Sequence, residues 1–350
     1  MNISQIQSIH LEPSTYCNAK CPHCPRFNHI QNDVFESDGT LHPNLIQQHM
    51  DFAAMSKNLQ LEKLTSLRHV VLQGDKGDPC MNPRIDDFID MFATHKNSPW
   101  INLVTNGSIR NQKWWKQLGQ KNYQNLKVTF SIDGLDDTNH LYRIGLDFDD
   151  IINNAKSFID AGGIAEWKFI IFQHNQHQIH EAKKLSEQLG FRNFSIALPY
   201  ASRFKNQKNW KVIKDSQTVY TISLPEITKP YDFKIANVDS IEFTSESEDS
   251  EICPYLRKAN IYITASHKVI PCCMMHFDID LDYFGRDYLL KLVGSFESID
   301  LSIHALKSIL NNEFYTKNLN QSFVTGKWHN TCVKSCRDEL IKNIRLFKHP

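Results

Sequence analysis

Six apolar segments rich in β-branched residues alternate with segments of helical periodicity, and this alternation constrains the fold more than any other feature of the sequence. The predicted strands are Gln5–Leu11, Arg68–Leu72, Trp100–Val104, Leu126–Ile132, Trp167–Phe172 and Phe194–Leu198. The predicted helices between and after them are Pro43–Leu59, Pro83–Lys96, Gln112–Gly119, Asp149–Ala161 and Ile179–Leu189. Such alternation is typical of βα units wound in one direction around a parallel sheet. The sequence therefore predicts an α/β fold.

The charge balance excludes some classes of partner. The chain has 39 Lys and Arg residues and 39 Asp and Glu residues, so its formal charge is zero. Without an excess of positive charge, general binding to nucleic acid is not expected. The first residues lack the basic and apolar regions of a secretory signal, and no run of about 18 apolar residues predicts a membrane span. We expect a cytoplasmic protein with no membrane partner.

Polar and glycine-containing turns follow four of the predicted strands. They lie at Gln73–Asp75, Thr105–Gly107, Ser131–Gly134 and Gln173–Asn175. Because the carboxyl ends of parallel strands meet at one edge of a sheet, these turns are candidates for the rim of one ligand site. The alternative is that their Gly, Asn and Asp residues only form the turns.

The nine cysteines favour metal or redox chemistry over a disulfide framework. Cys17, Cys21 and Cys24 follow the first predicted strand with the spacing C-x3-C-x2-C. Three thiolates so close in sequence can bind three irons of a cubane cluster, which leaves the fourth iron open to a small-molecule chelate. A zinc site would need a fourth ligand from elsewhere in the chain, and a ferredoxin would normally supply a fourth cysteine.

A second group of cysteines lies near the C-terminus. Cys253, Cys272, Cys332 and Cys336 provide four thiolates, with Cys273 as a spare neighbour. They predict either one 4Fe-4S cluster or a four-cysteine zinc site. Together with the acidic stretch before Cys253, this pattern predicts three parts: a barrel at 1–200, a linker or substrate-side segment at 201–252, and a small module with a β-hairpin and helices at 253–350.

The N-terminal cysteine spacing resembles that of the radical S-adenosylmethionine (SAM) superfamily, where it follows the first strand of a partial (βα)6 TIM-like barrel. The resemblance implies a 4Fe-4S cluster on Cys17, Cys21 and Cys24, with SAM bound to the open iron. His23, before the third cysteine, stands where the family often has an aromatic residue. The implied reaction is reductive cleavage of SAM to a 5′-deoxyadenosyl radical, which then abstracts a substrate hydrogen.

Further motifs in the same order resemble the SAM-binding segments of that superfamily. Gly77-Asp78-Pro79 is similar to its Gly-Gly-Glu-Pro segment, so Asp78 is expected to hold the methionine ammonium group. Arg143 is expected to pair with the methionine carboxylate, and Lys168 is a second candidate for that contact. The complete set of expected SAM-binding residues is Gly77, Asp78, Pro79, Asn106, Ser131, Asp133, Arg143 and Lys168.

The segment from Cys253 to Cys273 looks like the hairpin-bearing twitch module, a shortened relative of the SPASM module. The resemblance implies one auxiliary 4Fe-4S cluster on Cys253, Cys272, Cys332 and Cys336, although the last pair has the spacing C-x3-C and the family usually has C-x2-C. Such a cluster is suited to accept an electron from a substrate radical, which favours an oxidation.

Three functions are therefore compared. The first is a radical SAM oxidoreductase that dehydrogenates a small molecule and receives electrons from a donor such as flavodoxin or ferredoxin. The second is a maturase that introduces a thioether or carbon–carbon crosslink into a peptide or protein. The third is a non-catalytic iron–sulfur or zinc protein, which would require all the SAM-like turns to be coincidental.

Overall fold

The protein is built around one large sheet. The structure is a computed structural model that describes residues 1–27, 36–199, 209–226, 254–282 and 286–324. Its main sheet has eight strands in the order β11-β10-β1-β3-β4-β5-β6-β7. Six of them run parallel in chain order: β1 (Ser8–Leu11), β3 (His69–Leu72), β4 (Trp100–Thr105), β5 (Leu126–Ser131), β6 (Ile164–Ile170) and β7 (Asn193–Ala197). They confirm the six predicted strands and the α/β fold class.

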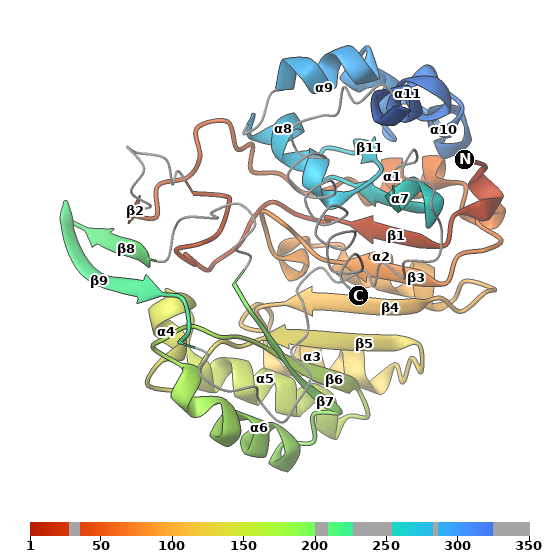
Figure 1. Ribbon diagram of the computed structural model, residues 1–350. Coiled ribbons are helices and arrows are strands. Elements are labelled where there is room, and N and C mark those ends of the chain that lie inside the picture. The colour runs from red at the N-terminus through yellow and green to blue at the C-terminus, as the bar shows by residue number, and fades with distance from the viewer. Residues whose placement is uncertain (28–35, 200–208, 227–253, 283–285, 325–350) are drawn as a thin grey trace, which may run out of the picture.

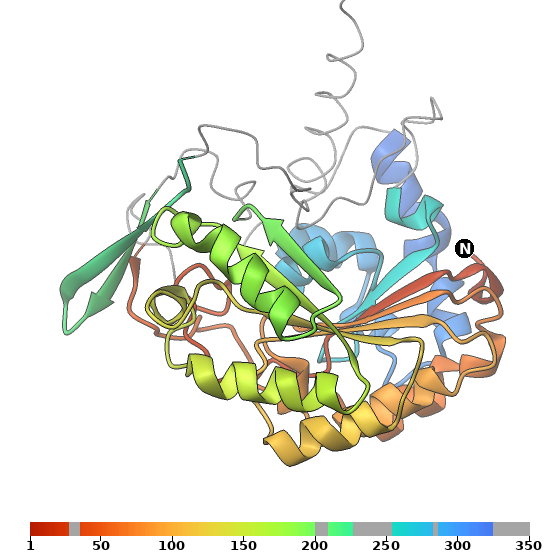
Figure 2. The same ribbon diagram turned by 90° about the horizontal axis from the view of Figure 1, so that it is seen from below.

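One face of this sheet is covered by helices, as Figures 1 and 2 show. The helices are α2 (Ile85–Ala93), α3 (Gln112–Gln120), α5 (Phe148–Asp160) and α6 (Ile179–Gln188). Strand β5 illustrates the packing, because the Phe130 ring lies 5.1 Å from Trp115 on α3 and 6.4 Å from Phe158 on α5. Successive side chains of a strand point to opposite faces, so Thr129 and Ser131 line a cavity on the other face.

The first helix is shorter than the sequence predicts. Helix α1 spans Phe52–Leu59, whereas the pattern predicts a helix from Pro43. The Asp51 side chain caps it by accepting hydrogen bonds from two amides of the first turn. Before this cap, the Gln48 amide donates to Thr15 Oγ1 over 2.7 Å. The segment preceding α1 is therefore held against the chain that leads to Cys17 instead of continuing the helix.

The C-terminal part adds two strands to the sheet. Strand β10 (Asn260–Ile263) pairs in parallel with β1, and β11 (Val269–Ile270) pairs antiparallel with β10. These are the two short strands predicted beyond Cys253. The helices of this part are α7 (Pro254–Arg257), α8 (His276–Asp280), α9 (Arg286–Val293), α10 (Leu306–Leu310) and α11 (Leu319–Val324). The predicted boundaries at 200 and 253 lie outside the described residues, and the division into domains stays a prediction.

A second, three-stranded sheet has the order β2-β8-β9. It consists of β2 (Glu36–Ser37), β8 (Asn209–Lys214) and β9 (Gln217–Ser223). The sequence pattern predicts no strands beyond Phe194–Leu198 until the C-terminal hairpin. The turn between β8 and β9 is nevertheless typical of a two-residue hairpin, because Asp215 and Ser216 have positive φ angles of 50° and 62°.

This second sheet packs against the cysteine loop. The Trp210 ring on β8 lies 4.7 Å from that of His23, between Cys21 and Cys24. The Tyr220 hydroxyl on β9 donates to the carbonyl of Leu141 over 2.7 Å, and Leu141 belongs to the short helix α4 (Asn139–Tyr142). The hairpin thus connects the cysteine loop with α4. No helix in the described ranges has the length and apolar character needed to cross a membrane.

Candidate functional site

A cavity of about 620 Å³ lies where the loops at the carboxyl ends of the strands meet. It brings together residues that the sequence places on six separate loops and strands. The predicted residues that line it are Cys17, Cys21, Cys24, Gly77, Asp78, Asn106, Ser131, Arg143 and Lys168. Two further predicted residues, Pro79 and Asp133, are buried behind this lining. The N-terminal cysteines and the SAM-like turns therefore form one site.

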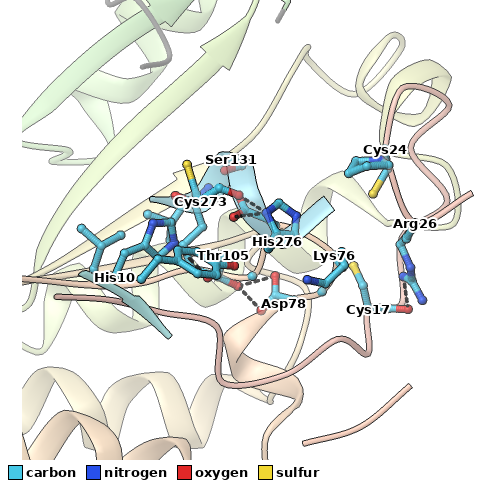
Figure 3. A pocket seen from close by; sticks show the side chains of 18 of the residues that line it. His10, Cys17, Cys24, Arg26, Lys76, Asp78, Thr105, Ser131, Cys273 and His276 are labelled. Carbon is cyan, nitrogen blue, oxygen red and sulfur yellow. Dashed lines mark hydrogen bonds and ion pairs between the residues drawn. The ribbon is translucent and has the colours of Figure 1, made fainter. Parts of the chain in front are cut away.

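Figure 3 shows that the labelled side chains occupy two sides of this cavity. Cys17 and Cys24 lie on one side, and His10 and Cys273 lie on the other. His10 belongs to β1, whereas Cys273 directly follows the C-terminal hairpin. The cavity wall thus combines the first βα loop with a segment more than 200 residues later in the chain.

Protein donors approach the cysteine sulfurs. Arg143 Nη1 donates to Cys21 Sγ over 3.6 Å. Asn106 Nδ2 lies 3.7 Å from Cys17 Sγ, and the Ala19 amide donates to the same sulfur over 3.4 Å. Hydrogen bonds and a nearby positive charge stabilise the thiolate form of a cysteine. This side of the cavity is therefore suited to hold negative sulfur ligands.

Burial acts on the thiols in the opposite direction. Burial is the largest cause that raises the pKa of Cys17 to about 11, followed by the negative charge of Asp78. Burial likewise raises the pKa of Cys24 to about 12, with Cys21 as the next cause. Without a cation these thiols stay protonated at neutral pH, whereas a metal centre binds thiolates and releases the protons. The thiolate forms of these cysteines are therefore expected only when a positively charged partner, such as a metal centre, is bound.

The placement of the thiols also bears on the kind of metal centre. Within the ranges that the structure describes, no three Cys, His, Asp or Glu side chains are close enough to hold a single metal ion. A four-iron cluster is larger than one ion, so its thiolate ligands stand further apart. Three cysteines around one cavity consequently fit such a cluster better than zinc.

The loop after β3 packs directly against the chain that leads to Cys17. A Cβ atom on Gly77 would lie 2.2 Å from the carbonyl oxygen of Ser14, so only glycine permits this approach. The Asp78 amide then donates to the carbonyl of Tyr16 over 2.8 Å. These contacts fix the position of the Gly77-Asp78-Pro79 segment beside the cysteine loop.

Asp78 joins the loops after β3 and β4. Its carboxylate accepts hydrogen bonds from the Thr105 hydroxyl at 2.9 and 3.0 Å, from the Asn106 amide at 2.8 Å and from the Cys80 amide at 2.9 Å. Burial raises the pKa of Asp78, and these hydrogen bonds offset part of the rise. Asp78 thus has a positioning role among protein groups, and its contact with the SAM ammonium stays a prediction. Cys80 is fully buried.

Arg143 is held by Asp133. Arg143 Nε lies 2.7 Å from Asp133 Oδ2, and the Asp133 side chain is completely buried. The other oxygen, Oδ1, accepts a hydrogen bond from the Ile170 amide over 2.6 Å. Burial alone would lower the pKa of Arg143, but the charge of Asp133 raises it above its usual range. Asp133 therefore orients Arg143 toward the cavity, and a direct contact between Asp133 and SAM stays a prediction.

The C-terminal cysteines are only partly described. Cys272 and Cys273 both line the cavity. Cys253, Cys332 and Cys336 lie outside the described residues. Among the described residues, His276 is buried next to Cys273, and its Nδ1 donates to the carbonyl of that cysteine. The ligand set of an auxiliary cluster accordingly stays a prediction.

Several residues at this site were not predicted from the sequence. Arg26 is buried, and its Nη1 donates to the carbonyl of Cys17 over 2.9 Å. Tyr262 on β10 lines the cavity with its ring 4.6 Å from His10 and 5.6 Å from His276. Lys76 lines it next to Gly77. Of these three residues, only Arg26 has a sequence signal that could have indicated a role at the site, because it lies two residues after the third cysteine.

Solved structures of SAM-bound proteins share this fold. Streptococcus suis SuiB bound to S-adenosylmethionine matches with a TM-score of 0.51 and 16% identity, over 78% of this chain and 61% of SuiB. SuiB bound to the precursor peptide SuiA matches with a TM-score of 0.53 and 15% identity, over 90% of this chain and 66% of that one. Native anSMEcpe with bound AdoMet and the Cp18Cys peptide matches with a TM-score of 0.54 and 14% identity, over 95% of this chain and 86% of that one.

The chain has the fold of these proteins. At such low identity the likeness concerns the fold alone, and this chain spans less than two thirds of the SAM-bound SuiB chain. No family model matches the sequence, and no curated protein matches it. The parallel α/β architecture with its helix-covered face is thus found both in this chain and in proteins that bind SAM.

Proposed function

We propose that this protein is a radical SAM enzyme. The observation that carries the proposal is the single cavity lined by Cys17, Cys21 and Cys24 together with Asp78 and Arg143. Three cysteines, a carboxylate and a largely buried arginine are the groups needed to hold an iron–sulfur cluster and both charged ends of a methionine moiety. The fold shared with SAM-bound SuiB and anSMEcpe supports the same conclusion.

Each part of the chain has a distinct task in this function. A 4Fe-4S cluster held by the three thiolates would supply the electron that cleaves SAM to the 5′-deoxyadenosyl radical. Asn106 and Arg143 stabilise negative charge on the sulfurs, since they approach Cys17 and Cys21. The loops bearing Gly77 and Asn106 form the rim against which SAM is oriented. A reactive carbon radical must be kept away from water, and enclosing the reacting groups in the cavity excludes water from them.

The substrate step is proposed to be an oxidation. Cys253, Cys272, Cys332 and Cys336 are the proposed ligands of an auxiliary 4Fe-4S cluster, which would accept the electron of the substrate radical. Cys272 lines the same cavity as Cys17, which favours a short path from the substrate to such a cluster. The product would be a dehydrogenated small molecule, and a flavodoxin or ferredoxin would supply the electron for SAM cleavage.

Modification of a peptide or protein is the second candidate. The observation in its favour is that two proteins of the same fold have peptide ligands, SuiA on SuiB and Cp18Cys on anSMEcpe. The β2-β8-β9 sheet packs against the cysteine loop through Trp210 and His23, and it is proposed as an additional surface for such a peptide. The two candidates differ in substrate and share the generation of the radical.

The test is iron content and SAM cleavage after anaerobic reconstitution. The wild-type protein should contain about eight irons and should form 5′-deoxyadenosine when reduced with dithionite. The variant Cys17→Ala, Cys21→Ala, Cys24→Ala should retain about four irons and form none. Cys80→Ala is a matched control because this buried thiol is adjacent to the site and is not a proposed ligand. Formation of 5′-deoxyadenosine by the triple variant would contradict the proposal.

A further inference from the structure

A buried lysine beside the proposed SAM-binding loop has no task in the function described above. Lys76 Nζ lies 2.9 Å from Glu12 Oε2 and 2.7 Å from Asp280 Oδ2. The Lys76 and Glu12 side chains are completely buried, whereas that of Asp280 is 17% exposed. Glu12 directly follows β1, and Asp280 is the last residue of α8. Lys76 therefore connects three segments that are far apart in the sequence.

Additional hydrogen bonds make these contacts a network. Glu12 Oε1 accepts from the Lys76 amide over 2.9 Å, and Glu12 Oε2 accepts from the Ala265 amide over 3.4 Å. Asp280 Oδ1 accepts from the Ser266 hydroxyl over 3.4 Å. Ala265 and Ser266 form the turn between β10 and β11. The C-terminal segment thus contacts this network through its hairpin as well as through α8.

The network depends on all three of its charges. The network joins one lysine to two carboxylates, and burial raises the pKa of Glu12 while the charge of Lys76 lowers it. Buried charges are tolerated only when they are paired and hydrogen-bonded. Burial alone would lower the pKa of Lys76, but Asp280 and Glu12 raise it above its usual range. Lys76 is consequently charged at neutral pH, and each carboxylate helps to keep its side chain in this position.

The position of Lys76 matters because of its neighbours in the chain. It directly precedes Gly77, whose backbone packs so closely against Ser14 that a Cβ atom would clash there. It also lies two residues before Asp78. Figure 3 shows Lys76 and Asp78 together in the cavity wall. Asp280 itself does not line the cavity. A change at Asp280 can therefore reach a ligand in the cavity only through Lys76 and its loop or through the packing of α8.

We propose that Lys76 is a positioning residue that holds the Gly77–Pro79 loop to Glu12 and Asp280, so that the affinity for SAM depends on a C-terminal residue outside the cavity. This inference rests on the proposed function, because it takes the loop to bind SAM. It makes the C-terminal segment part of the support for the cofactor, in addition to its contribution to the cavity lining.

The experiment compares Asp280→Asn with Asp282→Asn in anaerobically reconstituted protein. Both substitutions remove one negative charge from the same segment, but Asp282 is exposed and makes no ion pair with Lys76. Asp282 has a φ of 57°, which asparagine tolerates. Equilibrium dialysis with radiolabelled SAM should give a dissociation constant at least about fivefold higher for Asp280→Asn. The value for Asp282→Asn should stay within about twofold of the wild type.

Two further measurements separate positioning from mere stabilisation. Iron content and urea unfolding identify the variants that are folded and loaded, and SAM affinity is compared only among these. In the wild type, SAM should slow hydrogen exchange of the α8 amides, and Asp280→Asn should remove this protection. A purely structural role of Asp280 would lower stability and leave both the affinity and the protection unchanged, which would overturn the inference.

A second variant covers the case in which Asp280→Asn does not fold. Glu12→Gln, Lys76→Met and Asp280→Asn together remove the network without leaving an unpaired charge, so this variant should fold. Its dissociation constant for SAM should again be at least about fivefold higher than that of the wild type. An affinity within about twofold would overturn the inference. If the loaded wild type itself bound no SAM, the proposed function would fail, and this inference with it.

Discussion

The buried ion pair between Asp133 and Arg143 offers a quantitative test of how the cavity is built. Arg143 is 14% exposed in its side chain and Asp133 is not exposed at all. The substitution Asp133→Asn removes the negative charge and retains an oxygen that can accept the hydrogen bond from the Ile170 amide. The change in packing is therefore small, and the measured effect reports mainly on the lost charge.

The expected magnitude follows from the burial of the pair. Removing one partner of a buried ion pair leaves an uncompensated charge and costs about 3–5 kcal/mol. Because water reaches part of the Arg143 side chain, the lower end, about 3 kcal/mol, is expected here. The double variant Asp133→Asn, Arg143→Met leaves no unpaired charge, so its loss should be below about 1 kcal/mol. The double variant should thus be more stable than the single one.

The assay is urea unfolding of the cluster-free protein at pH 7, under reducing and anaerobic conditions, followed by circular dichroism. Asp160→Asn is a matched control, because Asp160 pairs with Lys156 at 2.8 Å on the surface of α5, with both side chains more than half exposed. Its cost should be within about 0.5 kcal/mol. A loss below about 1 kcal/mol for Asp133→Asn would refute the reasoning. Unchanged stability with abolished SAM binding would instead assign Asp133 a direct contact with SAM.

Three other predictions concern the thiols, the glycine loop and the auxiliary cluster. Burial raises the pKa values of Cys17 and Cys24 from the ordinary 9.0 to about 11 and about 12, so their protonated thiols stabilise the cluster-free protein fully below pH 9, and this contribution is lost as the pH rises toward these values. In the variant Cys17→Ser, Cys24→Ser, the free energy of unfolding should therefore fall less between pH 7 and about pH 10, by about 1.4 kcal/mol for each replaced thiol. Urea unfolding at the two pH values measures this difference, and an unchanged pH dependence would count against this burial. Gly77→Ala places a Cβ atom 2.2 Å from a carbonyl oxygen, so the loop must move and SAM affinity in equilibrium dialysis should fall at least about tenfold; normal affinity would contradict the tight loop. Cys272→Ala, Cys273→Ala should lower the iron content from about eight to about four with 5′-deoxyadenosine formation retained, and eight irons in this variant would exclude these cysteines as ligands.

The fold could be predicted from the sequence where periodicity and burial agree. The six strands β1 and β3 to β7 and helices α2, α3, α5 and α6 lie within a few residues of the predicted ranges. The prediction fails where tertiary contacts decide. Contacts between Gln48 and Thr15 prevent an early start of α1, and the β8–β9 hairpin lacks a long apolar alternation because one face of β9 is largely exposed.

The candidate site divides in the same way. Cys17, Asp78 and Arg143 were predicted because a cluster and a methionine moiety require particular residue types at particular points of the chain. Glu12 and Lys76 were not predicted, because the sequence displays their charges without indicating which charges meet. A carboxylate directly after a strand and a lysine in a glycine loop are common on protein surfaces. Their pairing depends on how β1, the loop after β3 and α8 come together.

The two sides of the cavity are constrained by different chemistry, and this explains why the cofactor is easier to infer than the substrate. On one side, the proposed function requires three thiolates from a single short loop to bind one cluster, and this requirement constrains their spacing. On the other side, Tyr262, Cys273 and His276 come from the C-terminal hairpin and the residues after it. The proposed cluster on Cys17, Cys21 and Cys24 does not constrain their spacing. Substitutions there are therefore expected to change the substrate while SAM cleavage persists, as long as the contact from Asp280 to Lys76 is kept.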